Sequence, residues 1–189
     1  MKPFYIFLLV VVSHPMFAQT KETFKDPRDN KTYEVVKINN QTWFARNLDF
    51  AMPGAVYPKV EKGDQYGLLY NWEIAQKGCP AGWRLPNEDD WKTLVTALGG
   101  KYAAGGKMKG NTPDWKSPNK VHATPSGFNA LPAGTISGGV YKAFSESALF
   151  WSSEVECTSA NTVVLGYAAA FSDKKILPKT DLLSVRCVK

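Results

Sequence analysis

The segment from Cys79 to Gly100, CPAGWRLPNEDDWKTLVTALGG, predicts the most sharply bounded helix in the chain. Pro86 cannot continue a preceding helix, and Asn87 is a good N-cap because its side chain can accept a backbone N–H of the first turn. Acidic residues 88–90 suit the positive end of the helix dipole. An apolar stripe follows at helical spacing: Trp91, Leu94, Val95 and Leu98. Gly99 and Gly100 then supply a left-handed stop.

The acidic triplet 88–90 has an alternative interpretation as a metal-binding or acid–base cluster. A capped, dipole-matched first turn explains it without any ligand, so we interpret it as structural. Trp83 and Trp91 are likewise predicted to be core anchors rather than ligand platforms, each able to bury about 150–250 Å².

The beginning of the chain indicates export. Lys2 precedes an apolar run from Phe4 to Val12, and Ala18 is a small residue suited to signal cleavage. The apolar run is too short for a membrane span. We therefore expect a secreted protein, located in the periplasm, at the cell surface or outside the cell. The predicted organisation is a signal peptide at 1–18, a flexible segment at 19–28 and one domain at 29–189.

The charge and the cysteine content limit which partners and cofactors we expect. The formal net charge is +6, and the basic residues are scattered singly or in pairs such as Lys174–Lys175, so we expect no nucleic-acid partner. Cys79, Cys157 and Cys187 would meet an oxidising compartment after export, which predicts one disulfide and one leftover thiol with three possible pairings. No CxxC spacing occurs, so no zinc site is predicted.

Periodicity along the rest of the chain predicts a small α+β domain. TYEVVKI and QTWFARN flank Asn39-Asn40 and predict a β-hairpin. A helix is predicted at 68–77, with Leu69, Trp72 and Gln76 on one face and Gly78 as its stop. Segments 49–65 and 99–124 predict loops, and GGKYAAGGKMKG lacks the GxxxxGK[ST] pattern of a phosphate loop. Four strand-like runs follow: GFNALPAG, ALFWSSE, TVVLGYAAAF and LLSVRCV. Short strands after two helices are typical of α+β domains.

Six segments, in this order, resemble the Fibrobacter succinogenes major paralogous domain family of exported bacterial proteins. They are KINNQTWFARNL, YGLLYNW, CPAGWRLPNEDDW, SGFNALPAG, FWSSE and SVRCV. The resemblance implies a C-type-lectin-like fold, with two helices packed on small twisted antiparallel sheets with long loops. It also implies that SVRCV lies beside the first strands and that Cys187 is near Cys79, which leaves Cys157 as a free or intermolecular thiol. That pairing would close the longest of the three possible loops and tie down the last strand.

Neither a cofactor nor catalysis is expected from the motifs. The EPN, QPD and WND triplets of calcium-dependent lectins do not occur, and calcium needs six to eight converging oxygens. Formylglycine-generating enzymes share a similar RLP-x-E-x-x-W stretch but use a reactive cysteine pair near the C-terminus. Here Cys157 and Cys187 are far apart in the sequence. His122, in a loop, is the only histidine of the expected mature chain and has no evident catalytic partner.

We therefore expect an exported non-catalytic binding module that recognises carbohydrate or another cell-surface component. Its partner would be a glycan or a cell-envelope protein. The alternatives are a structural or interaction subunit of a bacterial surface assembly and an enzyme related to formylglycine-generating proteins. Aromatic and amide side chains in loops or beside glycines are the candidate ligand contacts. The candidates are Trp115, Asn119, Asn129, Tyr141, Asn161 and Tyr167.

Overall fold

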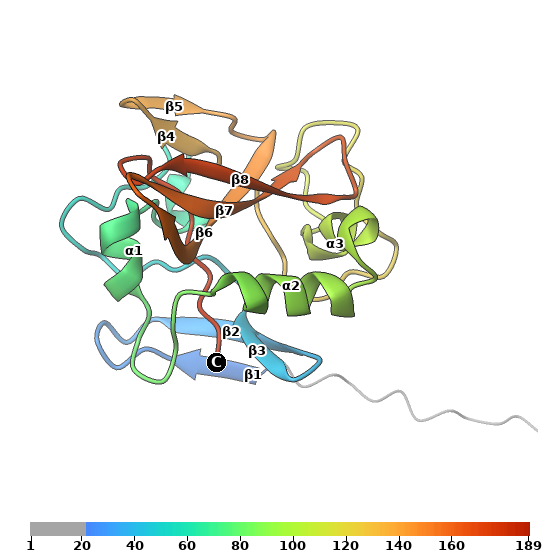
Figure 1. Cartoon of the computed structure of the whole chain (residues 1–189), viewed down its shortest axis with the longest axis horizontal. Helices are drawn as coiled ribbons and strands as arrows, with labels where there is room; N and C mark the ends of the chain where they lie inside the picture. The colour runs from blue at the N-terminus through green and yellow to red at the C-terminus, as the bar shows by residue number, and fades with distance from the viewer. Residues whose placement is uncertain (1–21) are drawn as a thin grey trace, which may run out of the picture.

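The computed structural model describes residues 22–189, so the predicted signal peptide lies outside the described residues. These residues form an α+β domain with three antiparallel sheets and three α-helices (Figure 1). The strands are β1 (Glu22–Lys25), β2 (Thr32–Ile38), β3 (Gln41–Phe44), β4 (Thr135–Ser137), β5 (Val140–Lys142), β6 (Ser147–Glu156), β7 (Ser159–Gly166) and β8 (Ser172–Pro178). The helices are α1 (Trp72–Gly78), α2 (Glu88–Ala97) and α3 (Lys101–Met108), with a short 3₁₀ helix, η1, at Gly63–Tyr66.

The first sheet contains the predicted hairpin and one unexpected strand. β2 and β3 pair in antiparallel register from Val35 opposite Phe44 to Ile38 opposite Gln41, and Asn39 has the positive φ of 56° that a two-residue turn needs. We expected residues 19–28 to be a flexible segment. Residues 22–25 instead form β1, which pairs along the outer side of β2 and places Phe24 against the core.

Helix α1 begins later than the predicted start at residue 68. Tyr70 is extended and exchanges two backbone hydrogen bonds with Leu183, of 2.8 and 3.0 Å. The side chain of Asn71 then accepts from the backbone N–H of Ile74 at 2.9 Å and caps the helix. Leu69, which we expected on a helical face, pairs with Val56 outside the helix. Tertiary hydrogen bonds therefore overrode the local helical pattern.

Helix α2 confirms the prediction from the central segment. Asn87 accepts from the backbone N–H of Asp90 at 2.8 Å, and the Asp90 carboxylate accepts from the backbone N–H of Asn87 at 2.7 Å, which completes a capping box. The C-terminal end turns through Gly99 and Gly100, whose φ values are +96° and +85°. α2 lies between the two three-stranded sheets, and its buried face contacts residues of both (Figure 1).

Residues 101–108 form helix α3, which corrects the prediction of a loop at 99–124. Two glycines made this segment look unsuited to a helix, because glycine costs about 1 kcal/mol relative to alanine in a helix interior. The loop between β7 and β8 packs so closely here that a Cβ at Gly105 would lie 2.2 Å from the Phe171 carbonyl oxygen. The backbone N–H of Gly106 also donates to the Ala170 carbonyl at 2.7 Å. These glycines therefore permit a close contact between helix and loop.

The C-terminal run 182–188 joins the separate parts of the domain without forming a regular strand. Leu182 pairs with Ile136, Leu183 with Tyr70, Ser184 with Phe150, and Val188 with both Trp43 and Arg84. The run thus bonds in turn to several different segments. The predicted proximity of SVRCV to the first strands is confirmed, because the Phe44 N–H donates to the Cys187 carbonyl at 3.0 Å. The predicted run GFNALPAG also makes only isolated bridges, whereas β8 was not predicted.

The cysteine pairing implied by the resemblance is confirmed. Cys79 and Cys187 form a disulfide within the first core cluster, which also contains Phe44, Trp83 and Trp151. Cys157 is a free, exposed cysteine in the turn between β6 and β7.

Arg186 is fully buried and makes hydrogen bonds only to neutral acceptors. Its guanidinium donates to Asn47 Oδ1 at 2.8 Å and to the backbone carbonyls of Phe44, Phe128 and Asn129. Its Cζ atom lies 4.4 Å from the centroid of the Phe128 ring. Burial lowers the pKa of Arg186. This side chain holds the C-terminal run against β3 and the 128–129 loop.

Candidate functional site

The candidate residues from the sequence occupy several different environments. Trp115 is not available to a ligand, because it belongs to the second core cluster and its indole N–H donates to the Ala130 carbonyl at 3.2 Å. Tyr141 is partly buried, and its hydroxyl donates to the Ala133 carbonyl at 2.8 Å. Tyr167 packs against the second cluster, with Lys116 Nζ 5.3 Å from its ring centroid. These three aromatic side chains are therefore used in packing.

The three candidate asparagines also lie in different environments. Asn129 is exposed with φ of 53°, and its carbonyl accepts from Arg186, so it serves the loop backbone. Asn119 is half-buried, and its Oδ1 has no hydrogen-bond partner among the described residues. Asn161 lies on β7 and faces a cleft. Of the six candidates, Asn161 alone lines this cleft.

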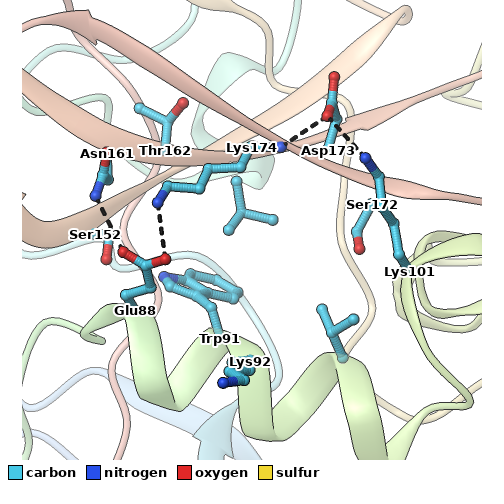
Figure 2. A pocket seen from close by; sticks show the side chains of 12 residues that line it. Glu88, Trp91, Lys92, Lys101, Ser152, Asn161, Thr162, Ser172, Asp173 and Lys174 are labelled. Atoms are coloured by element: carbon cyan, nitrogen blue, oxygen red, sulfur yellow. Dashed lines mark hydrogen bonds and ion pairs between the residues drawn. The ribbon is translucent and has the colours of Figure 1, made fainter.

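The cleft lies between α2 and the strands β7 and β8 (Figure 2), and its volume is about 230 Å³. Its floor is apolar and combines Trp91 and Val95 of α2 with Val163 of β7. Trp91 and Val95 are four residues apart and therefore share one face of the helix. Asn161 and Val163 are two residues apart and face the same side of their strand. One face of α2 and one face of β7 thus meet at this cleft.

Charged side chains form the rim of the cleft. Glu88 accepts from Lys174 Nζ at 2.8 Å, and Asp173 lies 3.8 Å from Lys101 Nζ (Figure 2). The side chains of Glu88 and Lys174 are about half exposed, at 52% and 50%. Exposed pairs of this kind contribute only about 0–1 kcal/mol, because water and salt screen them. The rim can therefore rearrange at low cost.

Two polar atoms beside the floor lack hydrogen-bond partners. They are the indole Nε1 of Trp91, which can only donate, and the Oδ1 of Asn161, which can only accept. Trp91 is 4% exposed and Asn161 is 6% exposed. An unpaired buried polar atom costs about 1–3 kcal/mol, so such atoms are rare in folded proteins and need an explanation. Here both atoms belong to residues that line one cleft.

The acidic first turn of α2 plays two roles. Asp90 is buried and bonds to Arg84, Gln41 Nε2 and the Asn87 backbone, as expected for a structural cap. Glu88 instead points to the cleft rim. Among residues 22–189, no group of three or more His, Cys, Asp or Glu side chains could hold a metal ion. His122 is exposed, does not line the cleft, and accepts the Thr124 backbone N–H on its Nδ1 at 3.1 Å.

Sequence reasoning did not find most of the cleft. Trp91 was interpreted as a core anchor, and most of it is indeed buried. Glu88 was assigned to the helix dipole and Lys174 was interpreted as a scattered surface charge, and β8, which carries Asp173 and Lys174, was not predicted. The register of β7 against β8 sets Asn161 opposite Ile176 and Val164 opposite Asp173, and the packing of α2 against this sheet brings Glu88 and Trp91 to the same cleft.

The match to known families covers most of the chain. A family model described as the Fibrobacter succinogenes major domain matches residues 36–189. The chain belongs to the Fibrobacter succinogenes major domain family. Neither the curated proteins nor the solved structures include a match to this chain. Between residues 22 and 189, none of the helices has the length and apolar character that a bilayer crossing requires.

The segments that carried the resemblance to the Fibrobacter succinogenes major domain mainly build its core. CPAGWRLPNEDDW supplies Trp83, Trp91 and Cys79, and SVRCV supplies Arg186 and Cys187. The polar residues contributed by β7 and β8 to the cleft come from outside those segments: Asn161, Asp173 and Lys174. Of the floor residues, Trp91 lies in these segments, whereas Val95 and Val163 lie outside them.

Proposed function

We propose that this domain is an exported, non-catalytic binding module that holds a carbohydrate or another cell-surface component in the cleft between α2 and β7–β8. The observation that carries the proposal is the pair of unpartnered atoms beside the apolar floor, Trp91 Nε1 and Asn161 Oδ1. Ligand sites typically combine apolar walls with a few convergent polar groups that fix orientation. A bound ligand would supply the missing acceptor and donor.

Export is part of the proposal and has two supports. The beginning of the sequence has the charge and apolar pattern of a signal peptide. The Cys79–Cys187 disulfide is of the kind that persists in oxidising compartments. We also propose that the domain is a C-type-lectin-like variant. The pairing of its C-terminal run with the N-terminal sheet supports this, as do its helices beside small antiparallel sheets. Fold by itself does not carry function, so the proposal rests on the cleft.

The test compares two variants that place the same large side chain on α2. Val95→Phe fills the cleft, whereas Thr96→Phe places a phenyl group on an exposed position outside it. The purified mature protein and both variants are applied to a glycan array and to a pull-down from a bacterial cell envelope. We expect binding by the wild type and Thr96→Phe, and its loss in Val95→Phe.

Two results would contradict this function. Equal binding by Val95→Phe and the wild type would place the ligand elsewhere on the domain. A stoichiometric envelope protein captured equally by all three forms, without any glycan signal, would instead favour a structural subunit of a surface assembly.

A further inference from the structure

Strand β8 has a free outer edge. It is the last strand of the sheet β6–β7–β8 (Figure 1), so within the described residues only its inner side pairs with another strand. The Lys179 N–H donates to the Thr158 carbonyl at 3.1 Å, in register with the ladder between β7 and β8. Hydrogen-bonded and non-hydrogen-bonded pairs alternate in antiparallel strands. The backbone groups of Lys174 and Ile176 therefore point away from β7.

The outward backbone groups around Ile176 are open to a partner. Lys174, Lys175 and Ile176 are exposed, and the Ile176 side chain is among the large hydrophobic ones that the fold leaves uncovered, at 49% exposure. Neither the N–H nor the carbonyl of Ile176 bonds to another segment of residues 22–189. The Lys174 N–H donates to the adjacent Asp173 side chain at 3.0 Å, which leaves the Lys174 carbonyl free. An antiparallel peptide can thus exchange two hydrogen bonds with Ile176 and donate a third to Lys174.

We infer that the outer edge of β8 binds an extended segment of another protein by strand addition, with an acidic side chain opposite Lys175 and an apolar side chain opposite Ile176. This inference goes beyond the proposed function, because the outer edge of β8 is a surface separate from the cleft. In strand addition, main-chain hydrogen bonds supply affinity and alternate side chains supply specificity.

The side chains of β8 select the chemistry of this segment. Lys175 forms no ion pair among residues 22–189, and its side chain lies on the opposite face of the strand from Ile176. A carboxylate opposite Lys175 forms a cross-strand charge pair, and an apolar side chain opposite Ile176 covers its exposed surface. Lysines on a sheet edge deter other strands from pairing there. An acidic segment overcomes that barrier because its charge is complementary.

A second copy of this chain fits the edge less well than an acidic segment does. Antiparallel pairing of two β8 strands over their full length, Ser172–Pro178, puts the two Lys175 side chains opposite each other. Like charges in directly opposite positions are destabilising. The edge therefore favours a different chain that carries acidic residues.

The experiment titrates the full mature protein with a short capped peptide of alternating valine and glutamate and follows the Ile176 amide by NMR. We expect a saturable shift of this resonance. With valine opposite Ile176, every valine N–H points to β8 and every glutamate N–H points away from it. N-methylation of the valines should therefore weaken binding by at least about tenfold. N-methylation of the glutamates is the matched control and should leave the affinity unchanged.

Charge selection is tested with variants of the protein. Lys175→Glu should weaken binding of the valine–glutamate peptide about three- to tenfold and strengthen binding of the corresponding valine–lysine peptide. Lys25→Glu makes the same charge change at an exposed position of β1, the edge strand of the first sheet, so its affinity should stay close to that of the wild type.

Several results would overturn the inference. An unmoved Ile176 amide, or equal weakening by the two N-methylated peptides, would exclude strand addition at β8. Unchanged binding of the valine–glutamate peptide by Lys175→Glu would remove the charge selection. Self-association of the protein alone that shifts the Ile176 amide would assign the edge to a second copy. Loss of a glycan or envelope ligand in Val95→Phe, without any peptide binding at β8, would refute this inference and leave the proposed function standing.

Discussion

Cys79 and Cys187 are joined by a disulfide that closes 108 residues of chain, with their Cα atoms 5.8 Å apart. The bond connects the residue just after α1 to the C-terminal run that pairs with β3 and with Arg84. The C-terminal run is thereby tied to the segment between α1 and α2 within one core cluster.

Removal of this disulfide should cost about 4–5 kcal/mol of unfolding free energy in the chain-entropy description, because the unfolded chain regains the conformations that the closed loop forbids. The double variant Cys79→Ser/Cys187→Ser, measured by urea unfolding, tests this value. Cys157→Ser is the control and should be unchanged, since Cys157 is exposed and unpaired. A Cys157-containing intramolecular disulfide in non-reduced peptide maps would contradict the assignment.

Asp90 should make the domain sensitive to acid. Burial acts to raise the pKa of Asp90, but hydrogen bonds from Arg84, the Asn87 backbone and Gln41 outweigh it and lower the pKa. A carboxyl group with a lowered folded-state pKa contributes stability above its unfolded pKa of about 3.9, and this stability is lost as the pH falls through the folded value.

Asp90→Asn should therefore lose about 1–3 kcal/mol of unfolding free energy at neutral pH. Below about pH 4, the unfolding free energy of this variant should depend less steeply on pH than that of the wild type. Urea unfolding across this range is the measurement. The exposed neighbour Asp89 is the control, and Asp89→Asn should keep the wild-type dependence of unfolding free energy on pH in this acidic range. The same dependence of unfolding free energy on acidic pH in the wild type and in Asp90→Asn would contradict this role of Asp90.

Arg186 should be one of the most sensitive positions in the chain. Arg186→Met removes a buried cation together with the donors to four acceptors in β3 and two loops, so those acceptors lose their partners. We expect a loss of about 3–5 kcal/mol, measured by urea unfolding. Arg46→Met at an exposed position should change stability by less than about 0.5 kcal/mol. A change at Arg186 as small as that at Arg46 would contradict this assignment.

Buried tyrosines should limit stability in alkali. Burial raises the pKa values of Tyr33, Tyr70 and Tyr141 well above their ordinary value. Because the folded state holds these protons more tightly, their contribution is complete below pH of about 10 and falls as the pH rises above it.

Tyr70→Phe should lose about 1 kcal/mol at neutral pH, because the Tyr70 hydroxyl donates to the Phe50 carbonyl at 2.9 Å. Its stability should fall less steeply above pH of about 10. Tyrosinate absorbance and urea unfolding measure the two effects, and Tyr102→Phe, at an 82% exposed position, is the control. Ionisation of Tyr70 near pH 10 in the folded protein would contradict the prediction.

Features governed by neighbouring residues in the sequence were predictable. Asn87 and Asp90 lie three residues apart, so the start of α2 followed from local hydrogen bonding, and the Asn39-Asn40 turn set the β2–β3 hairpin in the same way. The cysteine pairing required more than local pattern, because three pairings were open until the resemblance placed Cys187 near Cys79.

Helix α3 and the cleft depended on contacts between distant segments, which no local pattern contains. Gly105 is tolerated in a helix because the Phe171 carbonyl approaches it, and Trp115 is buried because its indole N–H reaches Ala130. The amino-acid sequence by itself determined α2, the first hairpin and the family. Tertiary structure decided that Asn161 and Trp91 meet at one cleft, because that meeting depends on the packing of α2 against the sheet of β6, β7 and β8.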